Sequence, residues 1–431
     1  MDNNTLYKIQ NAHLQHEKWK ELSFDKRQKY LLQLSNLLRA KKEELGVIIT
    51  QDMHKPISQA IAEIEKCAGL CEYYAKIGNV LQIEKIKTES EISEVHHDSM
   101  GVILGIMPWN YPFWQVLRFA IPTLLAGNAV VMKHASNCTN SGNAIQKLLE
   151  EAGFPKDLFQ HLEIGHTEVE NCIANPLIKG VSITGSEEAG RKIASLAGQN
   201  LKKCVLELGG NDAFIVLEDA DLEKAAIAAA QARLQNCGQT CVAGKRFIIH
   251  KKIYDDFLNL MVNAFQKYSP KDAMDSTTTF AGMAREDLAQ ELEKQYTVAI
   301  ENGAEIILPL LRIDQQSFQP GLLKMNENNP IADQELFGPL AMVFLANDNL
   351  DALRIANNTS FGLANAVFTQ DKDMAIYFAN NLESGSVAIN QVFKSDVRLP
   401  FSGRKNSGFG TELSERAVLE FTSTKTIVGG F

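Results

Sequence analysis

The sequence has no long apolar run, no excess of basic residues and no regular set of cysteines. Because a membrane-spanning helix needs at least about 18 apolar residues in succession, a membrane span is excluded. The polar first residues also lack the apolar stretch of a signal peptide. A formal net charge of −9 over 431 residues leaves no basic stripe, which argues against a nucleic acid partner. Seven scattered cysteines, an odd number, favour reduced thiols in the cytoplasm over a disulfide framework.

What the chain does contain is the pattern of an α/β protein. About the first 84 residues are predicted to be helical, and Ser23 could cap one long helix whose leucines recur at helical spacing as far as Leu45. From Gly101 onward, short apolar runs alternate with helix-like segments, and a second stretch of this kind runs from Gly209 to Ile389. Strands that alternate with helices form parallel β-α-β units, so we expect doubly wound sheets. The length predicts two or three domains.

The C-terminal stretch "SERAVLEFTSTKTIVGG" is predicted to be a helix followed by a strand. The preceding sequence offers this strand no evident partner. A late, unpartnered strand often completes the sheet of another subunit, so we expect a homo-oligomer.

The stretch "LQNCGQTCVAGKR" holds Cys237 and Cys241, whose four-residue spacing suits one face of a helix. A zinc site would need two further cysteine or histidine ligands at finger spacing, and these are absent, so no metal is expected. A thioredoxin-type couple would need a CxxC motif, which is also absent. The pair is therefore either one reactive thiol with a bystander or two inert buried thiols.

Three other stretches place polar residues after predicted strands, where ligands bind in open α/β sheets. Asn110 in "PWNYP" could donate its amide to an oxyanion, or it could be a turn asparagine bonding its own backbone. Lys133 could reach a ribose hydroxyl or a phosphate, or it could be an ordinary strand-end lysine. Gly185 and Ser186 begin a helix whose N-terminus could face a phosphate, although a Gly-Ser turn is common without one.

Two acidic residues stand out as well. Glu207 interrupts an apolar strand just before a Gly-Gly pair. If its carboxyl group is buried there, its pKa would rise towards the range of a general base. If the side chain faces the surface instead, it would be an ordinary strand glutamate with no catalytic role. Glu335 in "ELFGP" could accept ribose hydroxyls or could be a solvated loop acid. None of these residues is decisive alone.

Taken in order, "PWNYP", "MKHAS", "ITGSEEAG", "LELGGND", "GQTC", "ELFGP" and "PFSGRKNSGFG" resemble the aldehyde dehydrogenase superfamily from about residue 90 to 425. The stretches "KHA" and "KRFII" are similar to those of its bacterial succinate semialdehyde dehydrogenases. The resemblance implies a Rossmann-type cofactor domain, which binds a dinucleotide without a GxGxxG turn, an α/β catalytic domain and a small bridging sheet. The ranges it implies are 1–84 and 101–208 for the cofactor domain, 209–397 for the catalytic domain, and 85–100 with 398–431 for the bridging and oligomerisation element.

The resemblance also implies how the residues act. Cys241 would be the nucleophile that attacks the aldehyde, and Asn110 with the Cys241 backbone N–H would hold the oxyanion. Glu207 would activate the water that hydrolyses the thioacyl intermediate. NAD(P)+ would be the cofactor, and the assembly a dimer or tetramer. The residues implied to bind the cofactor are Trp109, Lys133, Ser136, Gly185, Ser186, Gly209, Glu335 and Phe337.

The departures from the family pattern bear on cofactor and substrate. Ser136 replaces a glutamate that often binds the adenosine ribose, so NADP should be accepted, because a serine does not repel a 2′-phosphate. Arg118, eight residues after Asn110, would pair with a substrate carboxylate unless it is solvated on its helix, and Ser395 would also meet the substrate. Gln235 replaces a second arginine of some succinate semialdehyde enzymes, although Arg233 is near.

The predicted function is therefore oxidation of a small carboxylated aldehyde, with succinate semialdehyde as the first choice. Another semialdehyde or an aliphatic aldehyde is an alternative substrate. A CoA-acylating enzyme is disfavoured because such relatives generally lack the equivalent of Glu207. A non-catalytic binding protein on the same scaffold is the remaining alternative, since a fold does not imply a function. Cys237 is the expected bystander, which an oxidant could join to Cys241 only in poor helical disulfide geometry.

Overall fold

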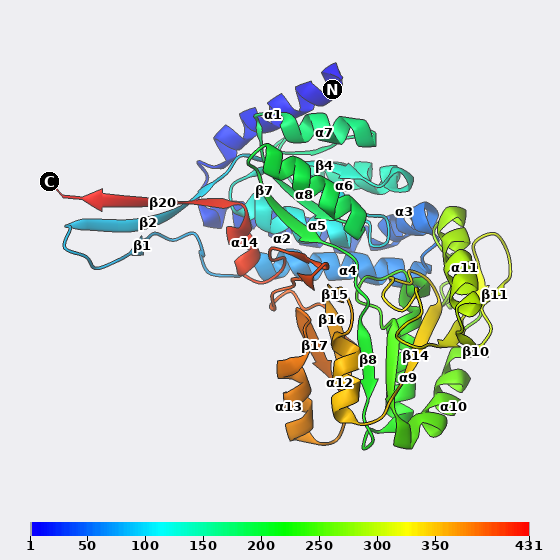
Figure 1. Ribbon diagram of the computed structural model, residues 1–431. Coiled ribbons are helices and arrows are strands. Elements are labelled where there is room, and N and C mark those ends of the chain that lie inside the picture. The colour runs from blue at the N-terminus through cyan, green and yellow to red at the C-terminus, as the bar shows by residue number, and fades with distance from the viewer. Residues whose placement is uncertain (1, 431) are drawn as a thin grey trace.

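The computed structural model describes residues 2–430 and begins with four helices (Figure 1). They are α1 (Asn3–Trp19), α2 (Phe24–Ala40), α3 (Lys42–Met53) and α4 (Ile57–Tyr74). The predicted helical N-terminal region is confirmed, but the single long helix is wrong: it divides at Lys41, whose ψ of 12° breaks the helical path. Ser23 does occupy the N-cap position of α2, yet its side chain makes no capping hydrogen bond.

The first sheet has six strands in the order β19-β7-β6-β3-β4-β5, and all neighbours are parallel except β19 with β7. All six residues of its β4 strand are buried, as expected for a parallel strand covered on both faces. The strands are β3 (Val102–Met107), β4 (Ala129–His134), β5 (Phe159–His161), β6 (Ile178–Thr184), β7 (Lys203–Glu207) and β19 (Gly408–Phe409). The accompanying helices are α5 (Trp114–Leu125), α6 (Thr139–Glu151), α7 (His166–Ala174) and α8 (Glu187–Gln199).

The second sheet has seven strands in the order β10-β13-β14-β9-β8-β16-β17, and only β10 runs antiparallel to its neighbour. It has a hydrophobic core separate from that of the first sheet. The predicted doubly wound α/β class is thus confirmed. Its strands are β8 (Ala213–Val216), β9 (Arg246–His250), β10 (Glu305–Leu308), β13 (Gly321–Lys324), β14 (Leu340–Ala346), β16 (Ala364–Phe368) and β17 (Ser386–Ile389). Its helices are α9 (Leu222–Leu234), α10 (Tyr254–Phe265), α11 (Glu286–Glu301), α12 (Asn349–Asn357) and α13 (Lys372–Asn381).

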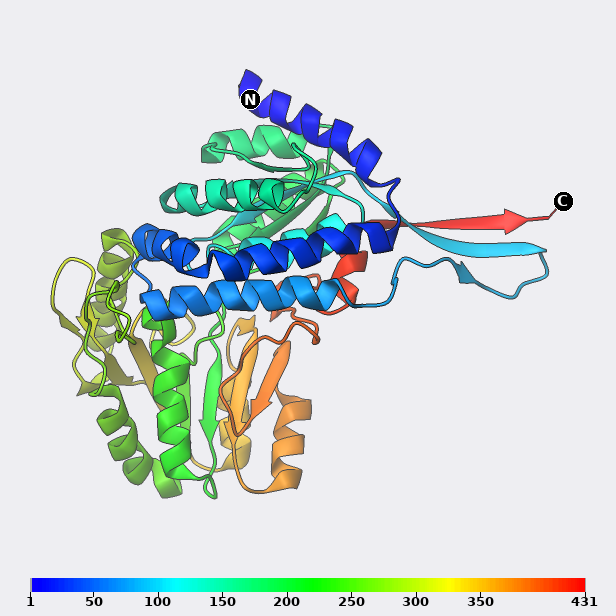
Figure 2. The same cartoon turned by 180° about the vertical axis from the view of Figure 1, so that it is seen from behind.

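Helix α4 lies between the two sheet-containing halves (Figure 2). Its first residues bond to the second half: the Ile57 N–H donates to the carbonyl of Ala273, and the Ser58 hydroxyl donates to that of Thr278. Side chains of α4 can therefore reach the space where the two halves meet.

A third sheet, in the order β1-β2-β20, projects from the body as an arm (Figures 1 and 2). It consists of β1 (Glu84–Lys85), β2 (Ile92–Ser99) and β20 (Thr422–Gly429), and β20 pairs antiparallel with β2 along its whole length. The expectation that the C-terminal strand has no partner in its own chain is wrong, because its partner lies far back in the sequence, where inspection of neighbouring segments does not reach. One edge of β20 remains unpaired.

The segment that precedes β20 packs on the first sheet. It supplies β19, and helix α14 (Arg416–Glu420) follows. The Tyr74 hydroxyl donates to the carbonyl of Ser414, and the Asn128 amide donates to that of Phe421. Within the range 398–431, β20 therefore forms the arm, while residues 408–421 belong to the body.

Short elements complete the described chain. They are the strands β11 (Leu311–Arg312), β12 (Phe318–Gln319), β15 (Phe361–Gly362) and β18 (Arg404–Lys405) and the 3-10 helices η1 (Ser136–Cys138), η2 (Gln235–Gly238) and η3 (Lys251–Ile253). Of the helices formed by residues 2–430, none combines the length and the apolar character needed to cross a membrane.

Candidate active site

The loop after β3 and the turn before β9 meet between the two sheets. The Asn110 amide donates to the carbonyl of Gln239 at 3.0 Å, and the Tyr111 hydroxyl lies 3.3 Å from that of Thr240. Cys241 directly follows these two residues. The structure thus brings two of the predicted catalytic residues, one from each half of the molecule, to one place.

The backbone around Cys237 is not a regular helix, and the expectation that Cys237 and Cys241 share a helix face is wrong. Helix α9 ends at Leu234, and Asn236 and Cys237 adopt left-handed φ angles of 52° and 56°. The Asn236 amide stabilises this path by donating to the carbonyls of Asn110 and Gln239. Cys237 is only 2% exposed, and burial raises the pKa of its thiol. It is a free thiol, as are the other six cysteines of the chain.

Cys241 is half-buried, and burial raises the pKa of its thiol to about 11, against a lowering by Lys245 and Arg118. The thiolate is the nucleophilic form of cysteine. At neutral pH the thiol form therefore dominates in the protein alone, so a base or a further positive charge must favour ionisation.

Lys245, which the sequence reasoning did not select, connects the Cys241 turn to Glu335. Its ammonium donates to the backbone carbonyls of Cys241 and, at 3.1 Å, Thr240. It also lies 3.1 Å from a carboxylate oxygen of Glu335, and its side chain is fully buried. Its position in the sequence could have indicated that Lys245 has a polar partner, because a lysine directly before a buried strand needs one.

Glu335 in turn lies against the Gly-Gly pair that follows β7. The Gly210 N–H donates to one of its carboxylate oxygens at 3.0 Å. A Cβ at Gly209 would lie 2.4 Å from the other oxygen, so a larger residue there would displace the Glu335 carboxylate. Gly209, which the resemblance implied to bind the cofactor, thus allows the Glu335 carboxylate to approach the backbone closely.

The remaining residues predicted to contact the cofactor lie after strands of the first sheet or near Glu335. Trp109 and Phe337 pack edge to face, with ring centroids 5.6 Å apart. Lys133 is buried at the end of β4; its ammonium donates to the carbonyl of His134, and burial lowers its pKa. Ser136 is exposed in η1.

Gly185 and Ser186 form the turn between β6 and α8. The Gly185 N–H donates to the carbonyl of Glu207 at 3.0 Å, and the Ser186 hydroxyl oxygen accepts from the N–H of Ala189 as the N-cap of α8. The N-terminus of α8 thus faces the carboxyl end of the sheet, where its dipole favours an anion.

Glu207 is buried at the end of β7, and within residues 2–430 neither of its carboxylate oxygens has a hydrogen-bond partner. Burial, followed by the nearby Glu412 carboxylate, raises its pKa well above the ordinary range. The reading of Glu207 as a solvated surface residue is therefore wrong. A carboxyl group whose pKa is raised in this way is a stronger base in its ionised form.

Arg118 is not solvated on its helix either. It is 2% exposed and forms an ion pair with Glu412, which is equally buried, and its guanidinium lies 4.8 Å from the Phe401 ring centroid. Burial raises the pKa of Glu412, and Arg118 opposes that shift. Arg118 therefore already has a carboxylate partner within the protein, which the sequence reasoning did not anticipate.

Ser395, the second residue predicted to contact substrate, accepts a hydrogen bond from the ammonium of Lys66 at 2.7 Å. Lys66 lies in α4, and the sequence around it, "EIEKCAG", carries no signal of a site. Arg233, near the position of the missing second arginine, is fully buried and donates to the carbonyls of Gly238, Gly244 and Leu336. It stabilises the turn and is not available to a substrate.

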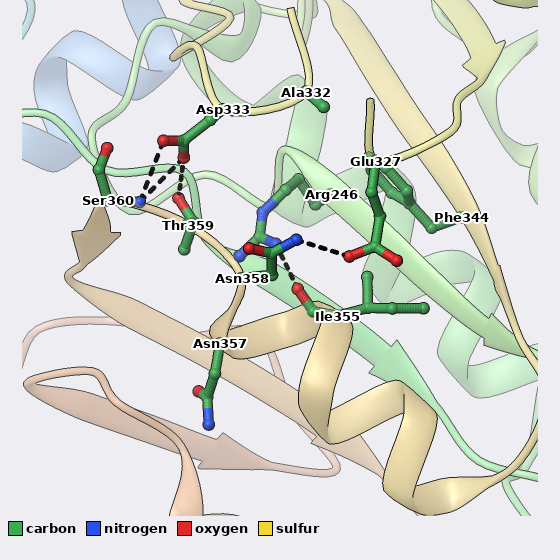
Figure 3. Close-up of a pocket in the computed structure, with 10 residues that line it drawn as sticks. All are labelled: Arg246, Glu327, Ala332, Asp333, Phe344, Ile355, Asn357, Asn358, Thr359 and Ser360. Atoms are coloured by element: carbon green, nitrogen blue, oxygen red, sulfur yellow. Dashed lines mark hydrogen bonds between the residues drawn. The ribbon is translucent and has the colours of Figure 1, made fainter. Parts of the chain in front are cut away.

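A separate polar cavity lies beside β9 and α12 (Figure 3). Its polar groups already bond one another: Asn358 donates to Glu327, and Asp333 accepts from Thr359 and Ser360. None of the predicted catalytic residues lines it. The residues that line it are Arg246, Glu327, Ala332, Asp333, Phe344, Ile355, Asn357, Asn358, Thr359 and Ser360.

Comparison with known proteins gives consistent matches. The model of the family described as "Aldehyde dehydrogenase family" matches residues 3–427. A probable NADP(+) succinate-semialdehyde dehydrogenase of Synechocystis is 40% identical over 415 residues, which are 95% of this chain and 91% of that protein. An NAD(P)+ succinate semialdehyde dehydrogenase of Escherichia coli is 40% identical over 95% of this chain and 89% of its own length. The crystal structure of the Streptococcus pyogenes succinic semialdehyde dehydrogenase with NADP+ aligns with a TM-score of 0.96, at 35% identity over 99% of this chain and 95% of that one.

Proposed function

Because the chain belongs to the aldehyde dehydrogenase family, we propose that it oxidises succinate semialdehyde to succinate with NAD(P)+. The observation that carries the proposal is the contact of the Asn110 loop with the Cys241 turn. The names of the similar proteins from Synechocystis and Escherichia coli support the substrate. A non-catalytic role on the same scaffold is not favoured, because the nucleophile, the amide and the buried carboxyl group are all present.

In the first step Cys241 attacks the aldehyde. Its sulfur forms a bond to the carbonyl carbon, and the carbonyl oxygen becomes an oxyanion. Asn110 and the Cys241 backbone N–H are placed to stabilise that charge, as preorganised donors do. The Asn110 amide has two N–H donors. One of them bonds to the Gln239 carbonyl in this structure, which leaves the other for the oxyanion. The thiol must also lose its proton, whose pKa of about 11 makes this costly at neutral pH.

When the oxyanion collapses, the former aldehyde carbon gives up its hydride, for which a bound nicotinamide dinucleotide would be the acceptor, and a thioester to Cys241 remains. The second part of the reaction is hydrolysis of this thioester. Glu207 is proposed to take a proton from water, whose oxygen attacks the thioester carbon and displaces the Cys241 thiolate. Burial of the Glu207 carboxyl group raises its pKa, which makes the ionised form a stronger base. A CoA-acylating enzyme would not need this residue, so Glu207 supports hydrolysis.

The residues present fit a nicotinamide dinucleotide, which supplies the hydride acceptor when bound. We propose that Lys133 and Ser136 hold the adenosine ribose end, Gly185 and Ser186 the pyrophosphate, and Trp109, Gly209, Glu335 and Phe337 the nicotinamide half. The buried Lys133 ammonium supports this placement, since it donates to the backbone carbonyl of His134 and has three N–H donors in all. The exposed Ser136 hydroxyl presents no charge that would repel a 2′-phosphate, and NADP(+) in the names of relatives supports its acceptance.

The experiment that tests the proposal is a panel of aldehydes assayed with NAD+ and with NADP+, following formation of the reduced cofactor. Succinate semialdehyde should give the highest kcat/KM. A higher value for an uncharged aliphatic aldehyde would replace the substrate with the broad-specificity alternative. Dependence of turnover on CoA would contradict the hydrolytic mechanism, and no reduction of either cofactor would contradict the enzymatic function.

We also propose the assembly, the division of the chain and the compartment. The ranges 1–84 with 101–208 would bind the cofactor, 209–397 would carry the nucleophile, and the arm formed by β2 and β20 would join copies of the chain in a dimer or tetramer. The projecting arm with an unpaired β20 edge supports this role. A nucleophilic free thiol is best maintained in a reducing compartment such as the cytoplasm.

A further inference from the structure

Lys66 in α4 stands apart from the other cations near the Cys241 turn. Three of those cations have carboxylate partners, in the ion pairs Lys55–Glu63, Arg118–Glu412 and Lys245–Glu335. Within residues 2–430, no carboxylate lies at ion-pair distance from Lys66. Lys66 is half-buried, and a charge that is partly removed from water is costly unless an opposite charge compensates it. The site therefore has an uncompensated positive charge at this position.

The Lys66 ammonium is held in place by neutral groups. It donates to the Ser395 hydroxyl at 2.7 Å and lies 4.0 Å from the Trp114 ring centroid. The Trp114 ring favours a cation without neutralising it. An ammonium has three N–H donors, and Ser395 takes one, so donors remain for another acceptor. The Ser395 oxygen accepts this bond, which leaves its own O–H available to donate.

Lys66 also lies close enough to the reacting groups to interact with their charges. Its pKa falls to about 8, chiefly through burial and next through the positive charge of Arg118, whereas Cys67, Glu63 and Cys241, in decreasing order, act in the opposite direction. Trp114 and Arg118 lie one turn apart at the start of α5, directly after the Asn110 loop. Through its contact with Trp114, the ammonium is thus placed where α4 meets the start of α5, the helix that follows the Asn110 loop.

We propose that Lys66 binds the distal carboxylate of the aldehyde substrate, with the Ser395 hydroxyl as a second donor, and so selects carboxylated aldehydes. The charge-assisted bonds would orient the other end of a short substrate towards Cys241. This inference rests on the proposed function and deepens it. It assigns to Lys66 the task that the sequence suggested for Arg118, which is already paired with Glu412.

The test compares Lys66→Met with the wild type on succinate semialdehyde and on butanal, which has the same number of carbons and no charge. Loss of a charge-assisted contact should lower kcat/KM for succinate semialdehyde about 30- to 100-fold and that for butanal by less than about threefold. Lys66→Arg, which keeps the charge, should recover part of the loss. Ser395→Ala should lower the value for succinate semialdehyde about threefold to tenfold, again selectively. Lys76→Met, at an exposed lysine just after the same helix, is the matched control and should change neither substrate.

Butanal turnover reports whether the variant protein is folded and its nucleophile competent. Equal losses on both aldehydes, or no loss on either, would overturn the role of Lys66. Three- and five-carbon semialdehydes are assayed alongside, so that the two proposals can fail separately. If the wild type prefers one of these, the proposed substrate is wrong, while a selective loss on that semialdehyde in Lys66→Met still supports carboxylate binding. A wild type that oxidises butanal but no carboxylated aldehyde would overturn both.

Discussion

The Lys245 ammonium lies 3.1 Å from the Glu335 carboxylate and contacts the backbone carbonyl of Cys241 from the same position. One fully buried side chain thus links the turn that carries the proposed nucleophile to a residue proposed to hold the nicotinamide half of the cofactor. A change at Glu335 should therefore alter the Cys241 turn, and a change in that turn should alter Glu335.

Replacing Lys245 with methionine should lower both the catalytic efficiency and the affinity for the cofactor. The carbonyls of the Cys241 turn would lose a charged donor, and Glu335 would lose its cation. Hydrogen bonds to charged groups are each worth about 1.5–3 kcal/mol, so we expect kcat/KM for the cofactor to fall about tenfold to a hundredfold. Steady-state kinetics and a fluorescence titration of cofactor binding measure the two effects. Lys252→Met, which removes an exposed ion pair with Glu218, should change either value less than about twofold. Unchanged cofactor binding in Lys245→Met would contradict the link.

Alkylation of Cys241 by iodoacetamide should depend steeply on pH in the protein without cofactor. Because its pKa is about 11, the thiolate fraction rises roughly tenfold per pH unit below that value. The inactivation rate should therefore increase by about that factor for each unit between pH 7 and 10. Lys245→Met should slow alkylation, since Lys245 lowers this pKa. Cys237→Ser is the control, and its rates should match the wild type because Cys237 is buried. A rate that is flat above pH 8 would show a much lower pKa.

The Arg118–Glu412 pair should matter for stability more than for substrate choice. Removing one partner of a buried ion pair costs about 3–5 kcal/mol, because the other charge is left unpaired. Arg118→Met should therefore lower the thermal midpoint and reduce activity on succinate semialdehyde and butanal alike. The double variant Arg118→Met/Glu412→Gln should regain most of the stability. A selective loss on succinate semialdehyde, with an unchanged midpoint, would instead return the carboxylate-binding role to Arg118.

Cofactor preference should respond to Ser136. A glutamate there would place a negative charge beside the 2′-phosphate of NADP+, so Ser136→Glu should shift the ratio of kcat/KM values towards NAD+ by at least about tenfold. Ser136→Ala is the matched neutral variant and should shift the ratio only about twofold to fivefold. The measurement is steady-state kinetics with both cofactors. If Ser136→Glu leaves the ratio unchanged, Ser136 does not lie at the ribose.

Glu207→Gln should separate the two halves of the reaction. The first turnover should still reduce one equivalent of cofactor in a rapid burst, while the steady-state rate should fall about 10²- to 10⁴-fold, the usual contribution of a general base. In the wild type the steady-state rate should rise with pH, because only the ionised carboxylate accepts a proton and the pKa of Glu207 is raised. Stopped-flow measurements follow both phases. Loss of the burst itself would place Glu207 in the first step.

The fold class could be predicted from the sequence because parallel strands that are buried on both faces consist of short continuous apolar runs. The run at β4 is an example. Prediction failed where structure depends on contacts between distant segments. The pairing of β20 with β2 and the left-handed backbone at Cys237 both depend on partners that lie elsewhere in the chain.

In the candidate site, too, some residues could be predicted from the sequence and others could not. Asn110, Glu207 and Cys241 could be proposed because each lies in a short, distinctive stretch. Lys66, Lys245 and Glu412 could not, because a charged residue becomes informative only when its burial and its partner are known. Arg118 was predicted to pair with a substrate carboxylate, but its partner in the structure is Glu412, which lies about 290 residues later in the chain.

The late position of β19 and β20 has a consequence for synthesis of the protein. The first sheet lacks its β19 edge, and β2 lacks its long partner, until residues 408–429 have left the ribosome. At usual rates of translation this delay is on the order of tens of seconds. During that time the N-terminal half must persist with an incomplete sheet edge, a period in which a chaperone or a neighbouring nascent chain can bind it.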